Sequence, residues 1–168
     1  FIHDEKLIRA IINVQSTQYV LCVTDITKTV PPSYSETLED AKKAIDLINL
    51  KGGRALIGYM GIPADEAFKY GKSPYDLLDS CVNISIGTSI LSELATQCKN
   101  PDSRKELIGK YSDYIGHEDD YFAEAALSNV EFLKSRKLID PDIEYDEIQS
   151  DLKDTEYNSN NSNPVSGN

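Results

Sequence analysis

The sequence predicts an α/β fold, with a three-layer, mainly parallel open sheet flanked by helices, a helical C-terminal part and an acidic tail. A β-prone run at 19–23, a helical pattern at 38–50 and a second strand-like run at 54–62 follow one another along the chain. This β-α-β order implies a right-handed crossover with helices packed on a sheet. The 168 residues suit one domain, and 40% apolar with 27% charged residues is ordinary globular usage.

The elements of the first half follow from periodicity and capping signals. A helix is expected over 3–15, where apolar residues recur at helical spacing and two acids stand in the first turn. The run 19–23 is continuously β-prone, as in a strand buried on both faces. The sequence Ser-Tyr-Ser-Glu at 33–36 has the pattern of a capping box, and the helical period then continues to Leu50. The glycines at 52–53 end that helix.

The second half changes from mixed to helical patterns. We expect a domain over residues 1–139 that is helical from about residue 100. We expect two short helical pieces within 64–79 separated at 71–74, a third strand at 81–86, a turn at Gly87-Thr88, and helices at 89–98, 102–115 and 119–138.

Residues 140–168 form an acidic, Asn/Ser-rich tail. This segment carries eight acidic residues and a single basic one, Lys153. Its few large apolar residues do not offset the entropy of ordering, so we expect it to be flexible. The whole chain has a net charge of −11, which disfavours nucleic-acid binding. No apolar run approaches the length of a membrane span, so none is expected.

Three cysteines, Cys22, Cys81 and Cys98, cannot all pair within the chain, and none has zinc-site spacing. The simpler interpretation is a reducing compartment, and we expect a cytoplasmic protein. A secreted protein with one disulfide stays open as an alternative, and the glycosylation sequon at 83–85 would be consistent with it.

An acid and two hydroxyls follow the first predicted strand: Asp25, Thr27 and Thr29. Ligands of open α/β sheets bind at the carboxyl ends of strands, and alternate residues of an extended segment point the same way. Three hard oxygen groups that converge there suit Mg²⁺ or Mn²⁺. The alternative is a turn in which the aspartate only caps backbone amides.

Thr88 stands between the predicted third strand and the next helix, where it is either a ligand or a plain N-cap. With Asp25-Ile26-Thr27-Lys28-Thr29 it resembles the von Willebrand factor A family, whose adhesion site combines D-x-S-x-S after the first strand with a Gly-Thr before a later helix. The resemblance covers about residues 18–98 and leaves the family's last aspartate unassigned, with Asp113, Asp119 and Asp120 at plausible sequence distance.

The resemblance implies a non-catalytic protein-binding module. Mg²⁺ or Mn²⁺ would be held by Asp25, Thr27, Thr29 and Thr88, and a partner carboxylate would complete the coordination sphere. Thr in place of both Ser keeps the hydroxyl but stiffens the side chain.

Two alternatives come from other classes of protein. One is a metal-independent acidic interaction protein, such as a toxin-neutralising or adaptor protein, that is steered toward a basic partner by its charge. The other is a small α/β hydrolase or transferase with Asp25 as general base or nucleophile, although the sequence favours a protein that is not an enzyme. We interpret His117 beside the acids at 118–120 as a solvated helix start, because contiguous side chains point in different directions.

Overall fold

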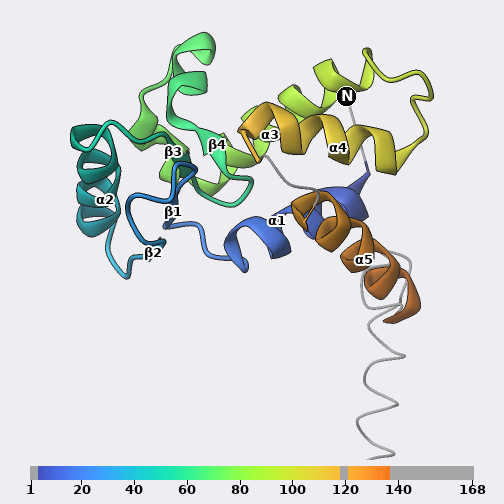
Figure 1. Cartoon of the computed structure of the whole chain (residues 1–168), viewed down its shortest axis with the longest axis horizontal. Coiled ribbons are helices and arrows are strands. Elements are labelled where there is room, and N and C mark those ends of the chain that lie inside the picture. Colours follow the sequence, from blue (N-terminus) through green and yellow to red (C-terminus); the bar gives the residue numbers. More distant parts are fainter. Residues whose placement is uncertain (1–3, 118–120, 137–168) are drawn as a thin grey trace, which may run out of the picture.

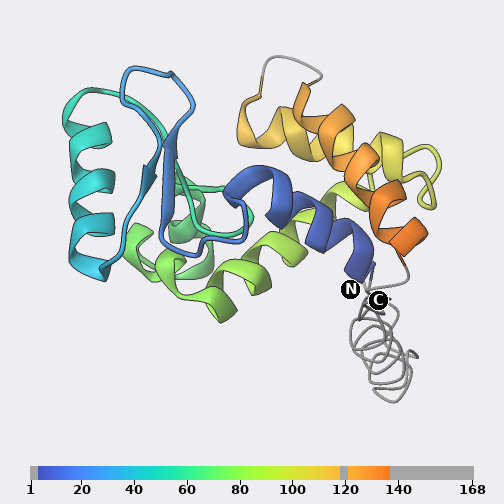
Figure 2. The same cartoon turned by 90° about the horizontal axis from the view of Figure 1, so that it is seen from below.

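The computed structural model describes residues 4–117 and 121–136, and only the backbone of 134–136. Helix α2 lies at one end of the molecule and α4 and α5 at the other, with a small sheet beside α2 (Figures 1 and 2). In chain order the elements are α1 (Glu5–Ser16), β1 (Cys22–Asp25), β2 (Ser33–Tyr34), α2 (Leu38–Leu50), β3 (Ala55–Ile57), β4 (Ile62–Pro63), the 3₁₀ helices η1 (Ala64–Tyr70) and η2 (Pro74–Leu78), α3 (Ser80–Ala95), α4 (Arg104–Ile115) and α5 (Tyr121–Arg136).

The sheet has the strand order β2-β1-β3-β4, and every pairing is antiparallel. The prediction of a mainly parallel three-layer sheet is therefore wrong. After Asp25 the chain reverses and runs antiparallel to β1 as β2. It then continues through α2, and β3 begins beside the end of β1. Asp25 consequently pairs with Ala55 at the start of β3, and no right-handed parallel crossover forms.

Helices α1 and α2 confirm two predicted helices, with corrected boundaries. Asp4 caps α1 by accepting a hydrogen bond from the Leu7 amide at 3.2 Å. The expected capping box at 33–36 is wrong, because Ser33 and Tyr34 form β2. Thr37 caps α2 instead, through a 3.2 Å hydrogen bond from the Asp40 amide.

The predicted strand at 81–86 is the first part of helix α3, and Gly87-Thr88 lies inside that helix. Asp79 caps α3 by accepting a hydrogen bond from the Val82 amide at 2.9 Å. The buried side of α3 follows a helical period rather than the alternation of a strand: Asn83, Ile86, Gly87, Thr88, Ile90, Leu91 and Leu94. A short apolar run is compatible with a strand or a buried helix, and here the cap favours the helix.

The prediction of one strand over 54–62 is wrong, because the chain there forms β3, a turn at 58–61 and β4, which pairs with β3 antiparallel. The strand predicted over 19–23 begins later, as β1.

The short helical pieces within 64–79 and the helices predicted after residue 100 are confirmed where residues are described. Two short 3₁₀ helices occupy the expected region, and α4 and α5 are helical. One cluster of buried apolar side chains runs from α1 and the sheet through α3 to α4 and α5. The expected tail, residues 140–168, lies outside the described residues. In the described part of the chain, each helix is too short or too polar to cross a bilayer.

The three cysteines are free thiols, and Cys22 is buried in β1. Burial raises the pKa of the Cys22 thiol to about 11. The sequon residue Asn83 is fully buried. Its amide donates hydrogen bonds to the carbonyls of Ile57 and Leu77, each at 2.8 Å, and accepts one from the Met60 amide at 2.9 Å. Folded protein therefore does not present Asn83 for glycosylation.

Candidate functional site

The Asp25 carboxylate stands at the end of β1, where the following loop closes around it. Its Oδ1 accepts hydrogen bonds from the Thr27 amide at 3.0 Å, the Thr27 hydroxyl at 2.7 Å and the Arg54 amide at 3.3 Å. Its Oδ2 accepts from the Thr29 amide at 3.1 Å, the Thr29 hydroxyl at 2.6 Å and the Val30 amide at 3.2 Å. Both oxygens are thus fully used as acceptors within the protein.

These hydrogen bonds decide the charge of Asp25, which is only 6% exposed. Burial raises the pKa of this carboxyl group, but the hydrogen bonds from Thr29, Thr27 and Arg54 outweigh burial and hold the pKa well below its usual range. Asp25 is therefore ionised at neutral pH. A carboxylate with so low a pKa is a poor proton acceptor, which argues against the hypothesis of a general base at this position.

The loop around Asp25 needs one glycine and one unusual backbone conformation. A Cβ placed on Gly53 would lie 2.7 Å from Asp25 Oδ1, too close for any atom to fit. Lys28 has a φ of 58°, in the left-handed region that non-glycine residues seldom adopt. The amide of Lys28 donates to the Asp25 carbonyl at 2.9 Å. The chain therefore folds tightly around the carboxylate.

The structure brings together three of the four expected metal ligands. The hydroxyl oxygens of Thr27 and Thr29 lie 3.2 Å apart, and both donate to Asp25. Thr88 lies in the interior of α3, where its hydroxyl donates to the carbonyls of Ile84 at 2.8 Å and Ser85 at 3.0 Å. Because the predicted third strand is a helix, Thr88 does not stand at a helix entrance.

Among the described residues no hydrogen bond joins Thr88 to Asp25, Thr27 or Thr29, the other three ligands that the resemblance implies. Within 4–117 and 121–136 no group of three or more His, Cys, Asp or Glu side chains could hold a metal ion. Of the candidates for the last ligand, Asp113 is an exposed residue of α4, and 119–120 lie outside the described residues. Mg²⁺ or Mn²⁺ binding at Asp25 stays a prediction.

A pocket of about 290 Å³ opens beside the Asp25 loop. It lies between β1, the end of α1, the Asp25 loop and the start of α5. Its polar lining consists of Gln15, Thr24, Asp25, Lys28 and His117. Its apolar and aromatic lining consists of Val14, Ile26, Pro32, Leu56, Tyr121 and Phe122.

His117 forms one wall of this pocket, and the ring of Phe122 holds it in place. The two rings are stacked, with centroids 4.7 Å apart and planes at 11°. The Nε2 atom of His117 lies 3.3 Å from Oε1 of Gln15, a buried residue of α1. The Gln15 amide in turn reaches the Thr24 hydroxyl at 3.5 Å. This polar chain links α1 and β1 to the segment before α5.

Sequence reasoning missed Gln15 and His117 as site residues. Gln15 is one polar residue at the end of an amphipathic helix, so no spacing marks it. His117 drew attention only through its acidic neighbours, whereas the structure orients it through aromatic stacking. The one available signal was that the chain has two histidines.

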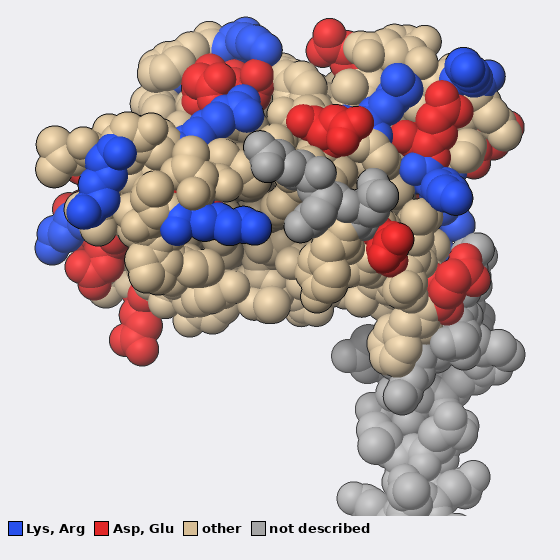
Figure 3. Space-filling model, viewed as in Figure 1, with Lys and Arg blue, Asp and Glu red and all other residues tan. Residues whose placement is uncertain are grey.

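Two charged side chains of opposite sign are among the described residues that line this pocket. Asp25 is buried and keeps its negative charge, which six donated hydrogen bonds stabilise, whereas Lys28 is exposed and makes no ion pair with a described residue. Elsewhere, acidic and basic side chains are interspersed over the face seen in Figure 3, without an extended field of one sign. The described lining of the pocket thus places an exposed lysine beside apolar and aromatic walls.

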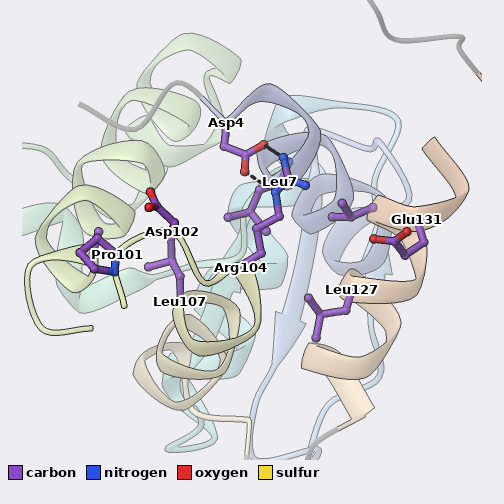
Figure 4. Close-up of a pocket in the computed structure, with 10 residues that line it drawn as sticks. Asp4, Leu7, Pro101, Asp102, Arg104, Leu107, Leu127 and Glu131 are labelled. Carbon is purple, nitrogen blue, oxygen red and sulfur yellow. Dashed lines mark hydrogen bonds and ion pairs between the residues drawn. The ribbon is translucent and has the colours of Figure 1, made fainter. Parts of the chain in front are cut away.

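A larger pocket, of about 510 Å³, lies between the start of α1, the loop before α4, and α5 (Figure 4). Its single cation, Arg104, is held by Asp4 through hydrogen bonds of 2.5 and 3.0 Å, and Glu131 faces it from α5. The hydrogen bonds to Asp4 raise the pKa of Arg104, and they outweigh burial, which lowers it; the negative charges of Asp4 and Glu131 raise it further. The cation of this pocket is therefore already ion-paired within the protein, whereas Lys28 has no ion pair among the described residues.

Comparison of the chain with protein-family models finds no match. Comparisons with curated proteins and with solved structures likewise find no significant match.

Proposed function

We propose that this protein is a non-catalytic binding module that works without a metal ion. It binds a partner protein by taking an apolar side chain with a neighbouring carboxylate into the pocket beside the Asp25 loop. The observation that carries the proposal is the contrast between two charges at the pocket: Asp25 is saturated by six hydrogen bonds, and Lys28 has no ion pair among the described residues.

The size and lining of the pocket support one side chain as the group bound. A volume of about 290 Å³ lies just below the usual range for small-molecule pockets. Burial of an aromatic ring against Ile26, Leu56 and Phe122 contributes roughly 25 cal/mol per Å² of apolar area. An exposed ion pair with Lys28 adds at most about 1 kcal/mol. Apolar burial thus supplies most of the affinity, and Lys28 supplies the preference for an acid.

The same geometry favours binding over catalysis. Asp25 is held ionised with every acceptor site filled, so proton transfer to it is unfavourable at neutral pH. Its two hydroxyl neighbours, Thr27 and Thr29, direct their protons into Asp25 rather than to a base that could activate them. The metal-dependent alternative is favoured by the 3.2 Å separation of these two hydroxyl oxygens, and the test below therefore includes a cation.

The test uses 3-phenylpropionate, a small molecule with one aromatic ring and one carboxylate. In a ¹H-¹⁵N NMR titration of the full chain we expect shifts of the Thr24, Lys28 and Phe122 amides. The matched amine, 3-phenylpropylamine, should bind about fivefold or more weakly, the equivalent of roughly 1 kcal/mol. Lys28→Gln should remove this difference.

Two controls separate the alternatives. Lys72→Gln changes an exposed lysine away from the pocket and should preserve the preference for the acid. Millimolar Mg²⁺ should leave the affinity for 3-phenylpropionate unchanged. Binding that requires Mg²⁺ would support the metal-dependent module, and absence of shifts at the pocket would overturn the proposal.

A further inference from the structure

The pocket of about 510 Å³ between the start of α1, the loop before α4, and α5 has a volume inside the usual range for small-molecule sites. It shares no described lining residue with the pocket beside the Asp25 loop. The apolar part of its described lining is aliphatic and holds no aromatic ring: Leu7, Ala95, Pro101, Leu107, Leu127 and Val130. A hydrocarbon chain therefore suits this lining.

The described lining of this pocket carries an excess of negative charge. It includes three acids, Asp4, Asp102 and Glu131, and one cation, Arg104. Arg104 forms an ion pair with Asp4 at 2.5 Å, so these two charges largely cancel. Asp102 and Glu131 then account for the excess. The sign agrees with the net charge of −11 of the whole chain, which attracts cations and repels anions at long range.

Two helices begin at this pocket, and the N-terminus of a helix by itself favours an anion. Both N-termini are already capped by side chains of the protein. Asp4 accepts a hydrogen bond from the Leu7 amide of α1 at 3.2 Å. The Ser103 hydroxyl accepts one from the Glu106 amide of α4, also at 3.2 Å. These caps occupy amides that an anionic ligand would use, so the helix ends do not reverse the preference set by the acids.

Asp102 and Glu131 lie on opposite sides of the pocket in the close-up, with Leu7 and Arg104 between them (Figure 4). Both acids are exposed, and Asp102 makes no ion pair with a described residue. Glu131 can accept a further donor beside any that it already has, because a carboxylate offers about four acceptor sites. Two acids separated by aliphatic walls match a molecule with a positive charge at each end of a hydrocarbon chain.

From these observations we propose that this pocket binds an aliphatic diamine. One ammonium group contacts Asp102 and the other contacts Glu131. The hydrocarbon chain between them lies against Leu7, Leu107 and Leu127. Burial of the chain supplies most of the affinity, because one exposed ion pair changes binding by no more than about fivefold. The two acids supply the preference for a cation.

The test titrates the full chain with 1,8-diaminooctane and follows the Asp102, Leu107 and Leu127 amides by ¹H-¹⁵N NMR. We expect all three amides to shift. The shorter 1,4-diaminobutane has the same two charges but less apolar surface, and it should bind at least about tenfold more weakly. Octanedioate, which carries two negative charges on a chain of similar length, should also bind at least about tenfold more weakly.

Neutral substitutions at the two acids test their roles. Asp102→Asn and Glu131→Gln should each weaken binding of 1,8-diaminooctane about threefold, and the double variant about tenfold, because exposed ion pairs are weak. Asp113→Asn removes an exposed acid of α4 that does not line the pocket, and it should leave the affinity unchanged. All three positions are exposed, so we expect each variant to keep the fold.

Two results would overturn this inference. One is the absence of shifts at the three pocket amides with 1,8-diaminooctane. The other is equal weakening by Asp102→Asn and Asp113→Asn, because the attraction would then come from the net charge rather than from the pocket. Either result leaves the proposed function intact, since that function is tested with 3-phenylpropionate at the Thr24, Lys28 and Phe122 amides.

Discussion

Gly53 lies against Asp25 so closely that a Cβ on Gly53 would come within 2.7 Å of the carboxylate oxygen Oδ1. The contact joins the turn after α2 to the end of β1. It also explains why the Arg54 amide, one residue further on, reaches the same oxygen at 3.3 Å. Two segments that are separate in the sequence, the end of β1 and the turn after α2, thus meet at one buried charge.

The first prediction concerns this close approach. Gly53→Ala should destabilise the fold by about 1–3 kcal/mol, because the added methyl group must displace Asp25 from its hydrogen bonds. Chemical denaturation measures the free energy of unfolding. Gly109→Ala is the matched control: the site on α4 has no atom within 4 Å of the added Cβ, so a gain of about 0.5–1 kcal/mol is expected there. Equal stability of wild type and Gly53→Ala would show that the site accommodates a side chain.

The hydroxyl groups of Thr27 and Thr29 supply a second prediction. Asp25→Asn replaces one carboxylate oxygen by an NH₂ group, which cannot accept the hydrogen bonds that the surrounding amides and hydroxyls donate. The substitution should lower the free energy of unfolding by about 3 kcal/mol. Thr29→Val keeps the shape of the side chain but loses the 2.6 Å hydrogen bond, and it should cost about 1 kcal/mol. Thr29→Ser keeps the hydroxyl and serves as the control. If Thr29→Ser were as destabilising as Thr29→Val, the methyl group rather than the hydroxyl would be the important part.

The pH dependence of stability follows from the low pKa of Asp25. The folded-state pKa lies below that of the unfolded chain, about 3.9. The stabilisation by ionised Asp25 is therefore complete above the unfolded pKa and is lost as the pH falls toward the folded pKa. The difference in free energy of unfolding between wild type and Asp25→Asn should be constant from pH 7 to about 5 and shrink below about pH 4. A difference that stayed constant down to pH 2 would mean that the carboxylate is not preferentially ionised in the folded state.

The helices were predictable because their signals are local. The amphipathic period of α1 extends over a whole element, although Asp4, which was predicted in the first turn, caps the helix instead. The same reasoning failed at 81–86, since a six-residue apolar run is compatible with either state. The cap at Asp79 and the period that continues to Leu94 would have predicted a helix. Strand direction was beyond reach, because the reversal into β2 depends on only two paired residues.

Only the part of the candidate site that lies close together in the sequence was predictable. Asp25, Thr27 and Thr29 converge as their spacing indicated, although through a loop that closes on the carboxylate rather than through an extended strand. Thr88 was predicted at a helix entrance because a strand was expected at 81–86, and that segment is part of α3. The contribution of His117 depends on the approach of α5 to α1 and β1, a long-range contact that carries no pattern in one sequence.

The next prediction concerns Tyr114, whose hydroxyl donates a hydrogen bond to the buried carboxylate of Glu66. Glu66 in η1 is buried, accepts a hydrogen bond from the Tyr114 hydroxyl of α4, and pairs with Lys69 at 2.7 Å. Burial, followed by the hydrogen bond to Glu66, raises the pKa of Tyr114 to about 12. Tyr114→Phe leaves a buried acid without one of its donors and should cost about 2 kcal/mol in the free energy of unfolding. Tyr19→Phe changes an exposed tyrosine and should cost less than about 0.5 kcal/mol. Equal small effects would show that Lys69 alone satisfies Glu66.

The last prediction addresses the cation. Because both Asp25 oxygens already accept three hydrogen bonds each, a divalent ion meets only two neutral hydroxyl groups, which are weak ligands for Mg²⁺. Millimolar Mg²⁺ or Mn²⁺ should therefore leave the wild-type Tm unchanged in differential scanning calorimetry, and a bound ligand would raise it. Thr88→Val should not alter that result, since the Thr88 hydroxyl bonds within α3. A rise in Tm that Thr27→Val and Thr88→Val both abolished would mean that the two segments do meet around an ion, in an arrangement of α3 different from the helix described here.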